Sequence, residues 1–124
     1  EYYSNVVRRF KVGGRMERLA GGNGVGYTGD GRLAIRAKLR CPHAALVYNG
    51  YVYVADMNNH AVRRFKIGGN IETIAGGNGV GHRGDGGDPK KAKLSTPAGF
   101  HAHGGYLYIA EYGNNDIRRC GLPE

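Results

Sequence analysis

The residues best suited to chemistry are two histidines near the end of the chain, His101 and His103. On a strand, side chains two positions apart lie on the same face, and two imidazoles on one face can begin a transition-metal site. The sequence assigns no third ligand. A metal-dependent enzyme that uses this pair is therefore one hypothesis. Calcium held by the Asn-, Asp- and Gly-rich loops is another, because such loops supply oxygen ligands.

Other catalytic arrangements are not indicated. The two serines, Ser4 and Ser95, stand in unrelated positions and suggest no nucleophile, base and acid set. The two cysteines, Cys41 and Cys120, lack the C-x-x-C spacing of redox and zinc sites, and we expect no bond between them. The residues thus favour a non-catalytic protein without a resident cofactor.

The charge pattern offers a binding function instead. Eighteen Lys and Arg against ten Asp and Glu give a formal charge of +8, which attracts polyanions. Arginine pairs recur in register, at Arg8, Arg9, Arg63, Arg64, Arg118 and Arg119. On a strand the two members of a pair face opposite ways. They are either structural arginines held by carboxylates and carbonyls, or a basic stripe that binds RNA or an acidic glycan.

Two glycine-rich stretches resemble phosphate-binding loops. "AGGNGVGYTGDG" at 20–31 and "AGGNGVGHRGDG" at 75–86 each contain G-x-G-x-x-G. A dinucleotide site also needs an acidic residue about 20 positions further on, and after Asp30 no acid occurs until Asp56. The stretches are better interpreted as connectors in which Asp30 and Asp85 accept backbone N–H bonds.

These loops belong to an internal repeat. Shifting the chain by 55 residues aligns 1–55 with 56–110 without a gap and gives 26 identities, and a partial third copy covers 111–124. Periods of roughly this length are typical of propellers and solenoids. We therefore predict one domain segment, 1–124, built from these copies.

Each repeat contains four predicted strands. In the middle copy they are the apolar segments 43–48, 51–55, 61–67 and 71–75. Asn49-Gly50 predicts a hairpin, and the next turn contains Asp56, Asn58 and Asn59, whose side chains satisfy turn backbone groups. Short helices are predicted within 32–39 and 89–94, the second capped by Asp88. Four antiparallel strands in sequence order form one blade of a β-propeller.

The stretches "YVYVADMNNHAVRRF", "IETIAGGNGVGHRGDGG" and "AKLSTPAG" resemble the NHL repeat. Its name comes from an Asn-His-Leu-like stretch, matched here by Asn59-His60-Ala61 except at the third letter. The resemblance implies an all-β propeller, commonly six-bladed, that serves mostly as a binding platform, with some enzymes among its relatives.

The chain holds about two and a quarter such blades, too few to close a propeller, which needs about four to eight. It is therefore either a fragment of a longer propeller or a subunit that completes its blades by self-association into a ring or filament. The expected partner is another protein or further copies of itself, with a polyanion as the alternative. No apolar run reaches the roughly 18 residues of a membrane span, and the compartment stays open.

Overall fold

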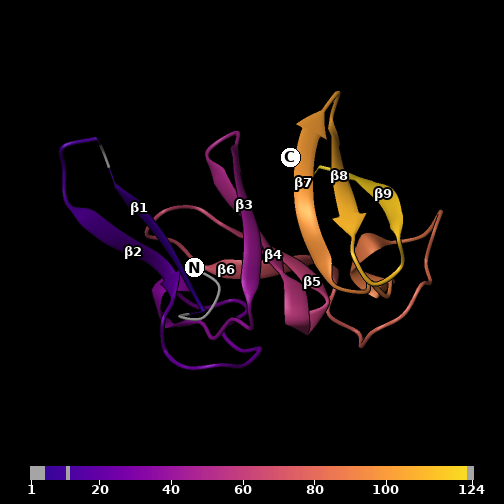
Figure 1. Cartoon of the computed structure of the whole chain (residues 1–124), viewed down its shortest axis with the longest axis horizontal. Coiled ribbons are helices and arrows are strands. Elements are labelled where there is room, and N and C mark those ends of the chain that lie inside the picture. The colour runs from indigo at the N-terminus through magenta and orange to yellow at the C-terminus, as the bar shows by residue number, and fades with distance from the viewer. Residues whose placement is uncertain (1–4, 11, 123–124) are drawn as a thin grey trace.

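Three antiparallel sheets follow one another along the chain in the computed structural model, which describes residues 5–10 and 12–122 (Figure 1). The first sheet has the order β1-β2, the second β3-β4-β5-β6 and the third β7-β8-β9. The strands are β1 (Val6–Phe10), β2 (Met16–Gly21), β3 (Pro42–Tyr48), β4 (Tyr51–Asp56), β5 (Ala61–Phe65), β6 (Ile71–Gly76), β7 (Pro97–His103), β8 (Tyr106–Glu111) and β9 (Asp116–Gly121). Neighbours in each sheet are consecutive in sequence, which confirms the predicted all-β meander.

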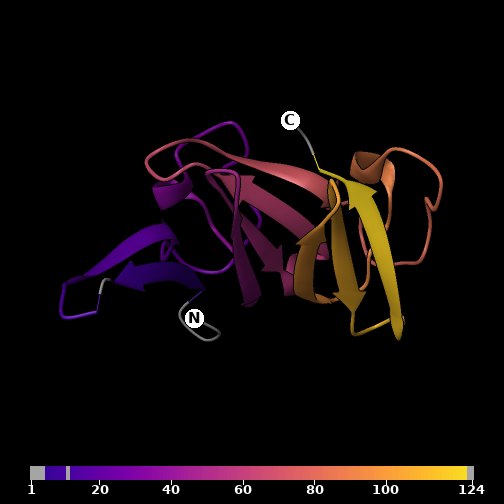
Figure 2. The same cartoon turned by 90° about the horizontal axis from the view of Figure 1, so that it is seen from above.

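Equivalent strands recur with the period of the sequence repeat. β3 and β7 begin at Pro42 and Pro97, and β5 and β9 begin at Ala61 and Asp116. The first strands of the second and third sheets lie side by side (Figures 1 and 2), and His43 on β3 bonds through Nδ1 to the carbonyl of Ala98 on β7 at 2.9 Å. This arrangement fits a fragment of a β-propeller, in which first strands line a common axis.

The helical predictions were too long. In the described ranges, helical structure consists of single 3-10 turns, η1 (Ala34–Arg36), η2 (Met57–Asn59) and η3 (Pro89–Lys91). The backbone after η1 is extended, because Leu39 forms an isolated β-bridge with Val25. The predicted cap is confirmed, since the Asp88 carboxylate accepts a bond from the Lys90 N–H at 3.0 Å. None of these turns has the length or apolar character to cross a bilayer, within the part of the chain that the structure describes.

The third strand of the middle copy is also shorter than predicted. It ends at Phe65 rather than at Ile67. The N–H of Gly69 donates to the carbonyl of Lys66 at 2.7 Å and closes a turn there, which leaves Ile67 46% exposed. The local turn thus overrides the apolar pattern.

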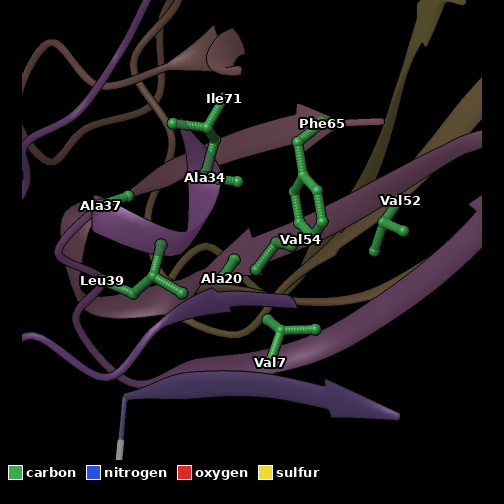
Figure 3. Packing of buried hydrophobic residues seen from close by; sticks show 9 residues of the cluster. All are labelled: Val7, Ala20, Ala34, Ala37, Leu39, Val52, Val54, Phe65 and Ile71. Carbon is green, nitrogen blue, oxygen red and sulfur yellow. The ribbon is translucent and has the colours of Figure 1, made fainter. Parts of the chain in front are cut away.

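One apolar cluster joins the first two sheets (Figure 3). It consists of Val7, Ala20, Ala34, Ala37, Leu39, Val52, Val54, Phe65 and Ile71. Three of its members, Ala34, Ala37 and Leu39, belong to the connector between β2 and β3 rather than to a strand. The connector is therefore part of the core.

A second cluster joins the second and third sheets. It consists of Tyr53, Val62, Ile74, Ala75, Leu94, Leu107 and Ile109. Here Leu94 comes from the connector between β6 and β7, in the place that Leu39 holds in the preceding copy. Each sheet is thus packed on the next through the connector that links them.

Candidate functional site

The first glycine-rich loop runs along the outer edge of the following sheet. The Gly31 N–H donates to the carbonyl of Ile71, and the Ile71 N–H donates to the carbonyl of Arg32, both at 2.8 Å. Gly29 has a φ of +101°, and a Cβ at this residue would lie 2.9 Å from the Ala37 Cα. The glycines therefore serve the turn and a close backbone approach.

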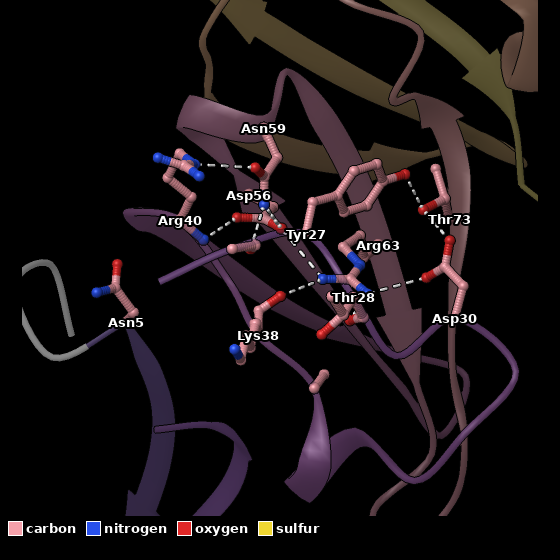
Figure 4. A network of polar contacts seen from close by, with 12 residues as sticks. Asn5, Tyr27, Thr28, Asp30, Lys38, Arg40, Asp56, Asn59, Arg63 and Thr73 are labelled. Carbon is pink, nitrogen blue, oxygen red and sulfur yellow. Dashed lines mark hydrogen bonds and ion pairs between the residues drawn. The ribbon is translucent and has the colours of Figure 1, made fainter. Parts of the chain in front are cut away.

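A buried arginine fastens this loop to the strands (Figure 4). Arg63 is fully buried, and its Nη2 donates to the Thr28 carbonyl at 2.7 Å and to Asp30 Oδ1 at 3.0 Å. Its Nη1 donates to the Lys38 carbonyl at 2.9 Å and to Asp56 Oδ2 at 3.3 Å. A guanidinium has enough fixed donors to join two loop carbonyls and two carboxylates at once.

The turn after β4 is built around Asp56. Its carboxylate accepts bonds from the Arg40 N–H and the Asn59 amide, both at 2.7 Å. Burial raises the pKa of Asp56, while the bonds from Asn59, Arg40 and Arg63 act in the opposite direction. Asn58 contributes its backbone N–H, which donates to the Arg40 carbonyl at 3.1 Å. The polar turn and the buried arginine form one network.

The third sheet repeats the network with different side chains. Arg118 donates to Asp85 and to the carbonyls of Lys93 and Arg83, each at 2.8 Å. Glu111 takes the place of Asp56 and accepts the Ser95 N–H at 2.9 Å. Burial raises the pKa of Glu111. Sequence reasoning did not single out Glu111, although its distance of one period from Asp56 was a signal for the same role.

In the second and third sheets, the second arginine of the pair stacks on a tyrosine. Arg64 lies 3.9 Å from the Tyr51 ring centre, and Arg119 lies 3.9 Å from that of Tyr106. Arg64 also pairs with Glu72 at 3.3 Å. The pair of the first sheet, Arg9 with Glu17, has the same positions in the repeat.

The structure divides the six arginines of the expected basic stripe. Arg63 and Arg64 are buried and Arg118 is 10% exposed, whereas Arg8, Arg9 and Arg119 are exposed. The buried members have carboxylate partners of this chain and do not form a continuous surface. Polyanion binding through the exposed members stays a prediction.

The histidine pair lies on the surface of β7. The rings of His101 and His103 stack with centres 6.4 Å apart and an angle of 18° between their planes. Within residues 5–10 and 12–122, no group of three His, Cys, Asp or Glu residues is placed to hold a metal ion. The metal hypothesis therefore rests on these two residues alone.

The remaining candidates have structural surroundings. Asp30 accepts bonds from the side chains of Arg63 and Thr73, and Asp85 from that of Arg118. The donors to both loop carboxylates are therefore side chains rather than the backbone N–H groups that the sequence predicted. Cys41 and Cys120 are free thiols. Of the two serines, Ser95 is buried and Ser4 lies outside the described residues.

The third sheet carries a groove along the outer edge of β9. It has a volume of about 560 Å³. Its walls come from β6, from the connector between β6 and β7, and from the last two strands, and they include Leu94, Ile109, Arg119 and Cys120. In the second sheet the equivalent edge, that of β5, is occupied by β6. The groove is therefore the place of a fourth strand.

The outward face of the third sheet is also uncovered. Ile117 is 74% exposed, whereas Val62, one period earlier, is fully buried against the third sheet. Tyr112 is 78% exposed beside it. A shallow hollow of about 540 Å³ on this face is lined by residues that include Ala110, Asn115 and Ile117. The groove and this face together form the candidate interaction surface.

Comparison with known proteins supports the fold alone. The chain is similar to a protein of unknown function from Bacteroides thetaiotaomicron, with a TM-score of 0.82 and 22% identity over 96% of this chain and 30% of that one. It is also similar to an auxiliary nutrient binding protein from Bacteroides ovatus, with a TM-score of 0.67 and 18% identity over 94% of this chain and 33% of that one. The chain thus spans about a third of the length of these structures. No described protein family and no curated protein matches it.

Proposed function

We propose that this chain is an NHL-type β-propeller segment of about two and a quarter blades that acts as a non-catalytic assembly module. In this proposal another polypeptide covers the outward face of the third sheet, either the rest of a longer propeller or a further copy of the chain. The observation that carries the proposal is the difference between Val62 and Ile117, which hold one position in the repeat and differ from fully buried to 74% exposed.

The polar contacts between successive units support the same conclusion. Asn5 Oδ1 accepts the Cys41 N–H at 2.7 Å, and His60 Nδ1 accepts the Thr96 N–H at 3.0 Å. Each acceptor thereby binds the residue just before the first strand of the next sheet. Asn115 has the same left-handed conformation, with φ 53°, and lines the hollow on the open face. In this proposal Asn115 accepts a backbone N–H of a following unit.

The outward face of the third sheet also has the apolar composition of a contact surface. It combines Ile117 and Tyr112 with the small side chain of Ala110, and exposed apolar faces of this kind mark contact surfaces. An uncovered sheet with an open edge invites association with another chain. Propellers remove such faces by packing each blade on the next.

The test compares two single substitutions at similarly exposed residues. Ile117→Asp places a charge on the proposed contact face, while Val47→Asp alters the end of the β3 and β4 hairpin, where Val47 is 70% exposed. We expect Ile117→Asp to lower the mass of the particle in sedimentation and Val47→Asp to leave it unchanged. Equal masses for both variants and a cooperatively folded unaltered chain would contradict the proposal.

A further inference from the structure

We infer that the groove along β9 binds an extended strand of the Ile-Glu-Thr type that comes from outside residues 1–124. This inference rests on the proposed function and names the chemistry of the partner. In the second sheet the equivalent edge, that of β5, is occupied by β6. The contacts of β6 therefore show what a strand bound along β9 would contact. Strand addition of this kind gains main-chain hydrogen bonds, while side-chain pockets give specificity.

The first requirement of the groove is an apolar side chain. On β6, Ile71 pairs with Phe65 and is fully buried in the cluster that joins the first two sheets. The counterpart of Phe65 is Cys120, which lines the groove with Leu94 and Ile109. Because a cysteine is smaller than a phenylalanine, the groove beside Cys120 has room for a branched aliphatic side chain.

The second requirement is a carboxylate. In the first two sheets an arginine pairs with a glutamate on the last strand of the sheet, Arg9 with Glu17 on β2 and Arg64 with Glu72 on β6. The third sheet has no strand in this position among the described residues. Arg119 holds the same position and stacks on Tyr106 as Arg64 stacks on Tyr51. Among the described residues no carboxylate pairs with Arg119. The charge of the groove therefore complements an acidic residue directly after the apolar one.

The third requirement is a hydroxyl donor. Thr73 donates to Asp30 Oδ2 at 2.6 Å, and the Asp30 side chain is 44% exposed. Its counterpart Asp85 is bound by Arg118 through Oδ1 and is 70% exposed. A threonine on the incoming strand would donate to the other oxygen of Asp85, which lies 3.9 Å from His82 Nε2.

The backbone of the second connector is placed to hold the strand as well. In the first connector, Gly31 and Arg32 exchange two hydrogen bonds with Ile71. Their counterparts, Gly86 and Gly87, line the groove, and no strand of the described residues pairs with them. The order of requirements along the strand is thus apolar, acidic and hydroxyl, as in Ile71, Glu72 and Thr73.

The test uses a synthetic peptide of residues 68–77, "GGNIETIAGG", labelled for fluorescence anisotropy and titrated with the whole chain. We expect saturable binding. A peptide with Glu72→Lys should bind about tenfold more weakly, since an attraction becomes a repulsion. A peptide with Ile71→Asp should lose about a hundredfold, since it fails to bury the apolar side chain.

Exchanging the charges of Arg119 and of the peptide glutamate tests whether the peptide binds along β9. The chain with Arg119→Glu should bind the original peptide weakly and the Glu72→Lys peptide well, whereas Arg9→Glu on the first sheet should change neither affinity. The peptide should also slow alkylation of Cys120, which lines the groove, and leave the buried Cys41 unaffected.

Three results would overturn the inference. They are the absence of binding, binding that ignores the charge exchange, and a second copy of the chain on β9 that the peptide does not displace. If the peptide fails while Ile117→Asp still lowers the particle mass, the proposed function stands and the strand inference alone falls.

Discussion

Asn5 and His60 occupy the same position of the repeat and make the same contact with different chemistry. Both have left-handed backbone conformations, with φ 53° and 52°. Each accepts a hydrogen bond from the backbone N–H that precedes the next sheet, Asn5 from Cys41 and His60 from Thr96. An amide oxygen and a neutral imidazole nitrogen are equivalent acceptors, but only the imidazole takes up a proton near neutral pH.

This difference predicts a pH-dependent stability. Burial lowers the pKa of His60 from its ordinary value of 6.5. The unfolded chain therefore binds a proton at a pH at which the folded chain does not, so the stability from this group is present above pH 6.5 and is lost as the pH falls. Thermal unfolding followed by circular dichroism should show this loss.

The control for His60 is taken from the repeat itself. His60→Asn copies Asn5 and should keep the bond to Thr96 while weakening the pH dependence. Asp56 and Glu111, whose pKa values burial raises, titrate with the opposite sign and contribute equally to both proteins. Equal slopes for the unaltered chain and the variant would contradict the role of His60.

Arg63 should be the most costly arginine to remove. Arg63→Ala would leave Asp56 buried without its cation, and breaking a buried pair costs about 3–5 kcal/mol. Arg9→Ala removes an exposed pair with Glu17, in which both side chains are 52% exposed, and should cost less than about 1 kcal/mol. Urea denaturation measures both, and similar losses would show that burial of the Arg63 network contributes little.

The glycine-rich loop can be tested with two of its own residues. Gly24 and Gly29 have nearly the same φ, +102° and +101°. A Cβ on Gly24 meets nothing within 4 Å, whereas one on Gly29 would lie 2.9 Å from the Ala37 Cα. Gly24→Ala should cost about 1–3 kcal/mol for the backbone alone, and Gly29→Ala about 1–3 kcal/mol more because of overpacking. Equal midpoints in urea would argue against close packing of the connector.

Much of the fold was predictable because the repeat presents each signal twice. The alternating apolar residues and the Asn49-Gly50 turn predicted the strands of the second sheet nearly to the residue. The end of β5 was not predictable, because Ile67 continues the apolar pattern and only the turn bond from Gly69 to Lys66 stops the strand.

The interaction surface was harder to predict. The sequence indicated that the last blade lacks a strand. Which residues are exposed as a result depends on the packing of one sheet on the next, and this packing is visible only in the structure. Val62 and Ile117 look alike in the sequence and differ because a sheet covers only Val62. Likewise, the arginine repeat did not distinguish the buried Arg64 from the exposed Arg119, which hold the same position one period apart.

We propose above all that the third sheet needs another polypeptide to cover it. The most direct measurement is the mass of the purified chain in sedimentation over a wide range of concentration, together with its circular dichroism. We expect either particles heavier than the 13.4 kDa of one chain or a single chain that lacks cooperative β-structure. A particle of 13.4 kDa that stays monomeric at high concentration and unfolds cooperatively would contradict it.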